Sequence, residues 1–286
     1  MEITTIVHTH GKPDVTLDTI DSIKHYMTDQ ILLVVDEAGW NQFNPQTAGV
    51  NMLKGFYHGY HRAPYRNIIL SLLTAAQHWP KADWFCYLEY DCLVGSSAFR
   101  SDLSWAEKSN VWMLGNDLRR KEERKVQFTL VETIIHSKFN EILYFLGAAL
   151  FYRGDFIRKC MEEKFFERFL YFTNDFKNGF FPGYTGPAAW DLIEHMMPTL
   201  ANHWGGSVRE LAKWSQGAHT WVGNNPRRYP IRWQPDLFLL EEEYLQASIM
   251  HPLKTINHPI REFHRAKRQR KIKDELDATI IRPIRQ

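Results

Sequence analysis

Two carboxylates separated by one residue end a strongly apolar segment of the chain. The segment "ADWFCYLEYDCLV", residues 82–94, is apolar from Trp84 to Leu88 and then carries Glu89 and Asp91. Because residues i and i+2 of a strand point the same way, both carboxylates can converge on one point just past the strand end. Two oxygen donors suit Mg²⁺ or Mn²⁺, which needs few protein ligands when substrate phosphates supply the rest. The alternative is a pair of solvated acids that merely end a strand.

The elements before this pair predict how it is positioned. "ITTIVHTHG" is typical of a strand that ends at a glycine, and "VTLDTIDSIKHYM" has Ile20, Ile23 and Met27 at helical spacing. "QILLVVDEAG" indicates a second buried strand, which closes on Asp36. A strand, a helix and a strand at this spacing predict a parallel sheet covered on both faces.

A second unit of the same kind leads to the carboxylate pair. In "HRAPYRNIILSLLTAAQHW", Pro64 suits the first position of a helix, and an apolar stripe runs along it at Ile68, Ile69, Leu72, Leu73 and Ala76. Ligands of open parallel sheets bind beyond the carboxyl ends of the strands. We therefore expect an α/β fold in which Asp36, Glu89 and Asp91 gather at one edge of a mostly parallel sheet. As a strand-end acid, Asp36 is expected to be solvated.

The alternation is less regular in the second half. Residues 111–114, "VWML", and 145–152, "FLGAALFY", predict strands, separated by the charged segment "NDLRRKEERK" and by a helix around residues 129–145. "TNDFKNGFFPGYTGP" predicts a long loop, which in a compact domain is more often functional than idle. The helix "AAWDLIEHMM" follows it.

The C-terminal end is the basic part of the chain. Residues 251–286 hold 10 Lys or Arg and 4 Asp or Glu, which leaves 25 and 29 for residues 1–250, although the whole chain has a net charge of +2. A mostly polar helix over "REFHRAKRQRKIK" is by default a solvated surface helix. An anionic membrane surface and a nucleic-acid backbone are its functional alternatives. We expect a main domain over 1–254, with halves 1–94 and 95–254, and a tail over 255–286.

Composition favours an ordinary globular protein. The hydrophobic and charged fractions are 44% and 24%, with a heavy aromatic load of 10 Trp, 12 Tyr and 18 Phe that suits a core and also stacking on a sugar or base. The three cysteines have neither a full set of disulfide partners nor zinc-ligand spacing, which favours a reducing compartment. No signal peptide or membrane span is evident. We expect a cytoplasmic protein, with peripheral contact to the inner membrane surface as an option for the basic tail.

The ordered series "VVDEAG", "HRAPYRNIILSLLTAA" and "ADWFCYLEYD" resembles the nucleotide-sugar half of GT-A fold glycosyltransferases. It is most similar to the large inverting family that includes cellulose and chitin synthases, and the resemblance covers roughly residues 3–94. The chain departs from that family by having Glu89 where Asp is usual and a single Asp36 where two acids often occur. The resemblance implies a metal-dependent transferase that uses a nucleoside-diphosphate sugar, with UDP preferred, and Mn²⁺ or Mg²⁺.

The resemblance also implies roles for individual residues. A late histidine completes the metal site in such enzymes, and His251 in "SIMHPLK" is the first choice, with His258 and His264 after it. The general base is expected at Asp191, with Glu194 one helical turn on as the fallback. The metal ligands are then Asp91, Glu89 and His251, and the donor contacts are Thr9, Asp36, Arg62, Arg66, Asn67, Glu89, Tyr90, Gly147, Ala148 and Lys254.

Other functions fit parts of the same pattern. A metal-dependent nuclease or nucleotidyl or phosphoryl transferase also needs convergent acids and basic residues, although usually more clustered carboxylates. A non-catalytic binding module is a third hypothesis. The acceptor stays open between a carbohydrate or lipid-linked oligosaccharide and a modified base in nucleic acid.

Overall fold

The first half of the chain forms the strand–helix units that its periodicity predicts. The computed structural model describes residues 1–56, 64–121, 126–173, 191–211, 229–231 and 244–280. Up to the carboxylate pair the elements are β1 (Ile3–Thr9), α1 (Pro13–Tyr26), β2 (Ile31–Val35), the 3₁₀ turn Trp40–Gln42, α2 (Pro45–Ala48), β3 (Asn51–Lys54), α3 (Pro64–His78) and β4 (Trp84–Glu89). Pro64 opens α3, as expected from its fixed backbone angle.

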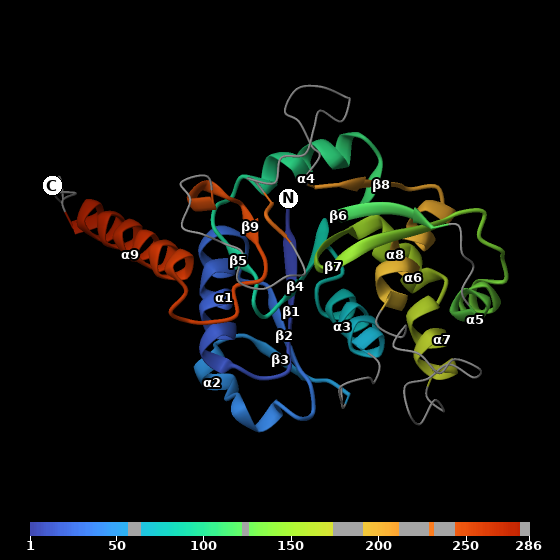
Figure 1. The fold of residues 1–286 in the computed structure, drawn as a ribbon, viewed down its shortest axis with the longest axis horizontal. Helices are drawn as coiled ribbons and strands as arrows, with labels where there is room; N and C mark the ends of the chain where they lie inside the picture. The colour runs from blue at the N-terminus through green and yellow to red at the C-terminus, as the bar shows by residue number, and fades with distance from the viewer. Residues whose placement is uncertain (57–63, 122–125, 174–190, 212–228, 232–243, 281–286) are drawn as a thin grey trace, which may run out of the picture.

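The order of the strands places a binding edge between β1 and β4. The seven-stranded sheet has the order β3-β2-β1-β4-β7-β6-β8, and β1 pairs in parallel with both β2 and β4 (Figure 1). The chain moves outward from β1 to β3 and then returns to the other side of β1. In α/β sheets such a reversal leaves a crevice at the carboxyl ends of the two central strands, where ligands bind. The predicted fold class, a mostly parallel α/β sheet, is confirmed.

The second half completes the sheet with longer strands. Its elements are β5 (Leu93–Val94), α4 (Phe99–Lys108), β6 (Val111–Lys121), α5 (Val126–Ile135), β7 (Ile142–Arg153), α6 (Gly154–Glu162), α7 (Phe165–Phe172), α8 (Asp191–His203) and β8 (Ser207–Glu210). β7 is antiparallel to both β4 and β6, whereas β8 is parallel to β6.

Two expectations for this half are wrong in extent. The charged segment does not end the strand at 114, because β6 continues to Lys121, and the expected helix around 129–145 stops at Ile135. Lys121 pairs with Ile142 at the start of β7, so the pairing of β6 with β7 holds both segments in the extended conformation. The charges are tolerated in a strand because they stay in solvent: the Arg120 side chain is 82% exposed and contacts Glu141 at 2.8 Å.

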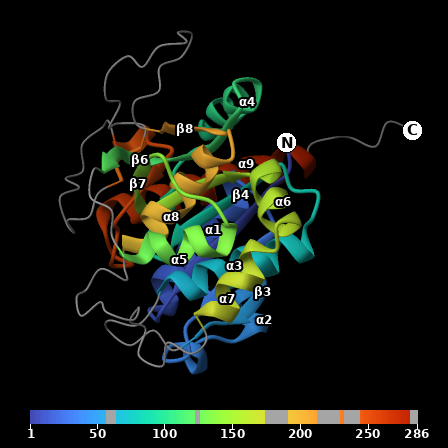
Figure 2. The ribbon, with the colours of Figure 1, turned by 90° about the vertical axis from the view of Figure 1, so that its right-hand side faces the viewer.

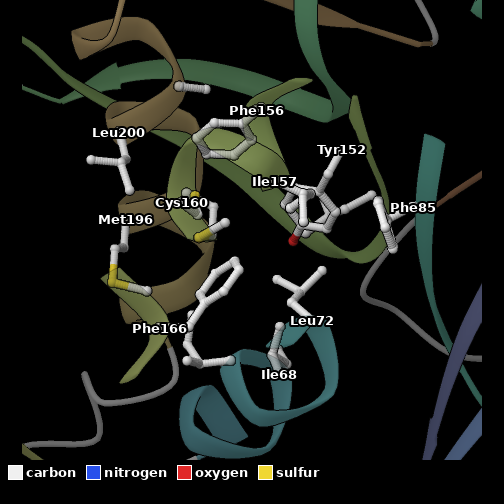
Figure 3. Packing of buried hydrophobic residues seen from close by; sticks show 14 of the residues in the cluster. Ile68, Leu72, Phe85, Tyr152, Phe156, Ile157, Cys160, Phe166, Met196 and Leu200 are labelled. Atoms are coloured by element: carbon white, nitrogen blue, oxygen red, sulfur yellow. The ribbon is translucent and has the colours of Figure 1, made fainter. Parts of the chain in front are cut away.

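Two apolar layers hold the helices against the sheet. The cluster on one face unites β-strand residues with α3 and with α5 to α8, and the cluster on the other face unites them with α1 and α4. Figure 3 shows the first layer, where Phe156 and Cys160 of α6 lie between Leu200 of α8 and Leu72 of α3. Figure 2 looks toward the helices that cover this face.

The C-terminal region returns to the carboxylate pair. After the turn Tyr244–Gln246, β9 (Ile249–Met250) pairs antiparallel with β5, and α9 (Pro259–Ile280) then leaves the body of the protein (Figure 1). α9 is a surface helix, as its polarity predicts, but one side of it is covered: Arg261, His264 and Arg268 are buried, whereas residues 269–273 are exposed. None of the helices in the described parts of the chain combines the length and hydropathy needed to cross a bilayer.

Candidate metal and nucleotide site

Glu89, Asp91 and His251 form a cluster just beyond the carboxyl end of β4. One ligand atom from each lies within 4.8 Å of the other two, and this is the only such group of three metal-ligating side chains in the described part of the chain. His251 Nε2 lies 3.1 Å from a Glu89 oxygen and 3.2 Å from Asp91 Oδ1. The structure thus brings together the three residues predicted as metal ligands, and neither His258 nor His264 is in the cluster.

Main-chain pairing delivers His251 to the two acids. β9 ends at Met250, and its pairing with β5 places the following residue beside the end of β4. The Leu253 N–H donates to the Asp91 carbonyl at 2.9 Å, which ties the two ligand-bearing segments directly. The Asp91 and His251 side chains are 2% and 3% exposed, whereas Glu89 is 31% exposed. The cluster therefore has a buried floor and one carboxylate toward solvent.

The hydrogen bonding of this cluster fits a bound cation. The single Nε2 proton of His251 is directed at Glu89, and Asp91 Oδ1 is buried without a hydrogen-bond partner among the described residues. One imidazole proton cannot serve two carboxylates, and an unsatisfied buried carboxylate oxygen is costly. A divalent ion on these two oxygens and one nitrogen would satisfy all three groups, and Mn²⁺ accepts both kinds of ligand.

Charge shifts the protonation of the same groups. Burial disfavours the imidazolium, but the nearby carboxylates of Asp91 and Glu89 outweigh it and raise the pKa of His251 to about 10. Burial likewise acts against the ionised form of Asp91, but His251 and Lys254 prevail and hold the pKa of this carboxyl below its ordinary value. Without a metal, the site is therefore an ion pair with a protonated histidine.

Asp36 lies at the same edge but is not the solvated acid that was expected. It is 2% exposed, and its Oδ1 accepts a hydrogen bond from the Gly39 N–H at 2.9 Å. Thr9, at the end of β1, is also buried, and its hydroxyl donates to the Gly11 carbonyl at 2.6 Å. Both side chains shape the turns that follow β2 and β1, since their polar atoms bond to the main chain.

Arg66 and Asn67 lie in the first turns of α3, as expected, but both have partners within the protein. The Asn67 side chain accepts from the Phe56 N–H at 2.6 Å and donates to the Phe56 carbonyl at 3.1 Å. Arg66 donates to the Thr173 hydroxyl at 2.9 Å and lies 4.5 Å above the Phe56 ring. These contacts fix the chain after β3, and a donor role for either residue stays a prediction. Arg62 lies outside the described residues.

The acceptor half contributes one buried carboxylate. Glu194 of α8 is 5% exposed and accepts a hydrogen bond from the Gly147 N–H of β7 at 2.7 Å. Gly147 lets this carboxylate approach the main chain closely, since an added Cβ would lie 2.8 Å from the Glu194 oxygen and the side chain would have to shift. Ala148 is buried in the opposite layer and its carbonyl faces Cys92. The side chain of Asp191, at the start of α8, lies outside the described residues.

Three polar residues beside the cluster, His8, His10 and Lys12, were not predicted from the sequence. Tyr90, which was predicted, forms a T-shaped ring contact with His10, with the centroids 4.8 Å apart. Lys12 extends its ammonium to the Lys254 carbonyl at 3.4 Å, which adds a cation near the predicted Lys254, and His8 pairs in register with Glu89. Their signal was "HTHGKP" at the end of β1, since residues there share the edge with those after β4.

Comparisons with known proteins identify no family for this chain. No family model and no curated protein sequence matches it. Among solved structures, it is similar to a glycosyltransferase involved in glycosylation of the major capsid of PBCV-1, at 12% identity over 93% of this chain and 100% of that one, with a TM-score of 0.38. The phosphocholine cytidylyltransferase LicC from Streptococcus pneumoniae matches at 13% identity over 74% and 90%, with a TM-score of 0.42.

A further match is to residues 1–349 of TarS from S. aureus, at 12% identity and a TM-score of 0.34. That alignment covers 56% of this chain and 49% of the other, so it spans about half of the TarS fragment. Likeness at these identities and TM-scores says no more about this chain than its own topology does.

Proposed function

We propose that the chain is a metal-dependent glycosyltransferase that moves a sugar from a nucleoside-diphosphate donor, UDP by preference, to an acceptor hydroxyl with inversion. The observation that carries the proposal is the cluster of Glu89, Asp91 and His251 at the carboxyl edge of the sheet, where the strand order reverses. Its sparse ligand set suits an ion that takes its remaining ligands from diphosphate oxygens. The order of motifs over residues 3–94, which resembles the nucleotide-sugar half of GT-A enzymes, supports the same function.

Charge at the site suits a diphosphate. Asp91 and His251 form the buried floor of the metal site, and Glu89, which is partly exposed, borders the donor. A divalent cation held by these residues would neutralise the charge that grows on the leaving diphosphate. Lys254, whose charge acts on Asp91, and Lys12 beside it provide further positive charge for the phosphates. Asp36 and Tyr90, which follow β2 and β4 at the same edge of the sheet, are the residues proposed for the nucleoside side of the site.

Inversion requires one carboxylate that accepts the proton of the acceptor hydroxyl. In the proposed step the hydroxyl oxygen bonds to the anomeric carbon, its proton passes to Asp191, and the bond to the diphosphate breaks with both electrons. Glu194 is less suited to be this base, because one of its oxygens is occupied by the Gly147 N–H. Asp191→Asn should keep donor and metal affinity while turnover falls by about 10²–10⁴. A product of retained configuration by NMR, or normal turnover of this variant, would refute the assignment.

A panel of nucleotide sugars with Mn²⁺, scored by thermal shift and by hydrolysis, tests the function itself. We expect UDP with Mn²⁺ to raise the melting temperature of the wild-type protein and to have little effect on Asp91→Ala. The matched control is Asp155→Ala, which removes an exposed acid of α6 that binds Arg158 and lies outside the cluster. Protection by DNA with Mn²⁺, and none by any nucleotide sugar, would favour the nuclease or nucleotidyltransferase alternative instead.

The acceptor and the cellular site belong to the proposal as well. We propose a carbohydrate or lipid-linked acceptor, with peripheral membrane contact through the basic α9. A modified base in nucleic acid is the second acceptor class. Offering a labelled sugar donor together with acceptors of each class, and measuring which acceptor becomes labelled, would decide between them.

A further inference from the structure

A buried arginine of the C-terminal helix contacts both segments that carry the buried metal ligands. Arg261 is 0% exposed and uses its whole guanidinium group. Its Nε donates to the Leu253 carbonyl at 2.9 Å, one terminal nitrogen donates to an Asp18 oxygen at 2.7 Å, and the other donates to the Thr19 hydroxyl at 3.2 Å and the Cys92 carbonyl at 3.1 Å. One side chain of α9 therefore joins α1, the segment after β4 and the segment after β9.

The two carbonyls that it binds are close to the ligands in sequence. Cys92 directly follows Asp91, and Leu253 lies two residues after His251. Between these segments there is also the hydrogen bond from the Leu253 N–H to the Asp91 carbonyl. The two segments are thus linked twice, directly by this main-chain hydrogen bond and indirectly through the guanidinium group of Arg261, and the two links together fix the distance between them.

We propose that Arg261 is a positioning residue that holds Asp91 and His251 at metal-binding distance, an inference that rests on the metal site of the proposed function. Residues that orient metal ligands through hydrogen bonds determine affinity without touching the ion. Arginine suits this task because its planar group offers several donors in a fixed geometry, whereas a lysine ammonium is a point charge. Asp18 anchors the group from α1 and balances its charge in the protein interior.

A second arginine of the same helix provides a matched control. Arg268 is 5% exposed and donates to the other oxygen of Asp18 at 2.5 Å, but none of its hydrogen bonds reaches the segments after β4 or β9 in the described part of the chain. If the arginines of α9 serve only to fasten the helix to α1, then Arg261 and Arg268 should behave alike. If Arg261 positions the ligands, then only its loss should affect the metal.

The experiment measures Mn²⁺ binding to the full chain, by the EPR signal of the free ion, in the wild type, Arg261→Met, Arg261→Lys and Arg268→Met. Melting temperatures recorded without metal set a temperature at which each protein is folded. We expect Arg261→Met to weaken Mn²⁺ binding by about 10–100-fold and Arg261→Lys to lie between it and the wild type. Arg268→Met should lower the melting temperature but keep the wild-type dissociation constant.

The outcomes separate this inference from the proposed function. Failure of the wild type to bind Mn²⁺ would overturn both. Wild-type binding that is unchanged in folded Arg261→Met, or weakened equally in Arg268→Met, would overturn the positioning role alone. Should Arg261→Met not fold, Arg261→Lys decides, since it keeps the charge opposite Asp18 and loses the shared geometry.

Discussion

Metal affinity should depend steeply on pH, because the ion must displace a proton from His251. The pKa of this imidazole is raised to about 10, so at neutral pH the ligand nitrogen is occupied. Below that pKa, each unit of pH costs about 1.4 kcal/mol of binding free energy, which is a factor of ten in affinity. Asp91 does not add to this dependence above about pH 6, because its pKa lies below the ordinary value for a carboxyl.

Between about pH 6 and 8.5, the apparent affinity for Mn²⁺ should therefore rise roughly 300-fold. EPR of the free ion measures the affinity, and calorimetry in two buffers of different ionisation enthalpy counts the protons released, about one per ion. His251→Gln is the control. The glutamine amide does not titrate in this pH range, so Mn²⁺ binding should be weaker and nearly independent of pH. A flat profile for the wild type, or no proton release, would refute the protonated state inferred for the cluster.

Three further substitutions test the surroundings of the site. Asp36→Ala should lower the affinity for the nucleotide, as measured by calorimetry. Because Asp36 is buried against the Gly39 N–H, the substitution should also lower the free energy of unfolding in urea by about 1–2 kcal/mol. An unchanged free energy of unfolding would argue against this turn contact. Asn67→Ala should lower the free energy of unfolding by about 1–3 kcal/mol, because the main chain of Phe56 loses two hydrogen bonds. A larger effect on donor binding than on stability would instead favour direct contact between Asn67 and the donor. Glu194→Gln should keep the contact to the Gly147 N–H and hence the melting temperature, with turnover within about tenfold; a greater loss would make Glu194 the base.

The sequence predicted the fold and the convergence of the two acids where local pattern and long-range geometry agree. The βαβ periodicity of residues 3–94 and the carboxyl-edge rule bring Glu89 and Asp91 to one point, and both are confirmed at that edge. His251 could be chosen only by its resemblance to a late histidine of GT-A enzymes, because its approach depends on a two-residue strand, β9, that has no periodicity of its own. Local pattern carries no signal for such a contact.

Predictions failed where a partner elsewhere in the chain decides the structure. The helix expected around residues 129–145 extends too far, because the pairing of β7 with β6 makes residues 142–145 part of a strand. Asp36 was expected to be solvated because an acid at a strand end usually is, but the turn that begins with it folds back and buries it. Likewise, the basic residues of α9 look alike in the sequence, and only the position of Asp18 on α1 shows which of them turn inward.

The separation of the proposed metal ligands along the chain has a consequence for folding. Glu89 and His251 are 162 residues apart, so the contact between them closes a long loop and costs roughly 4–5 kcal/mol of chain entropy. The first four strands, in contrast, form from neighbouring units along the chain. We therefore expect the sheet core to be stable before the segment from β9 to Arg261 docks. The amide protons of that segment should exchange faster with solvent than those of β1 and β4, and a bound ion should slow their exchange.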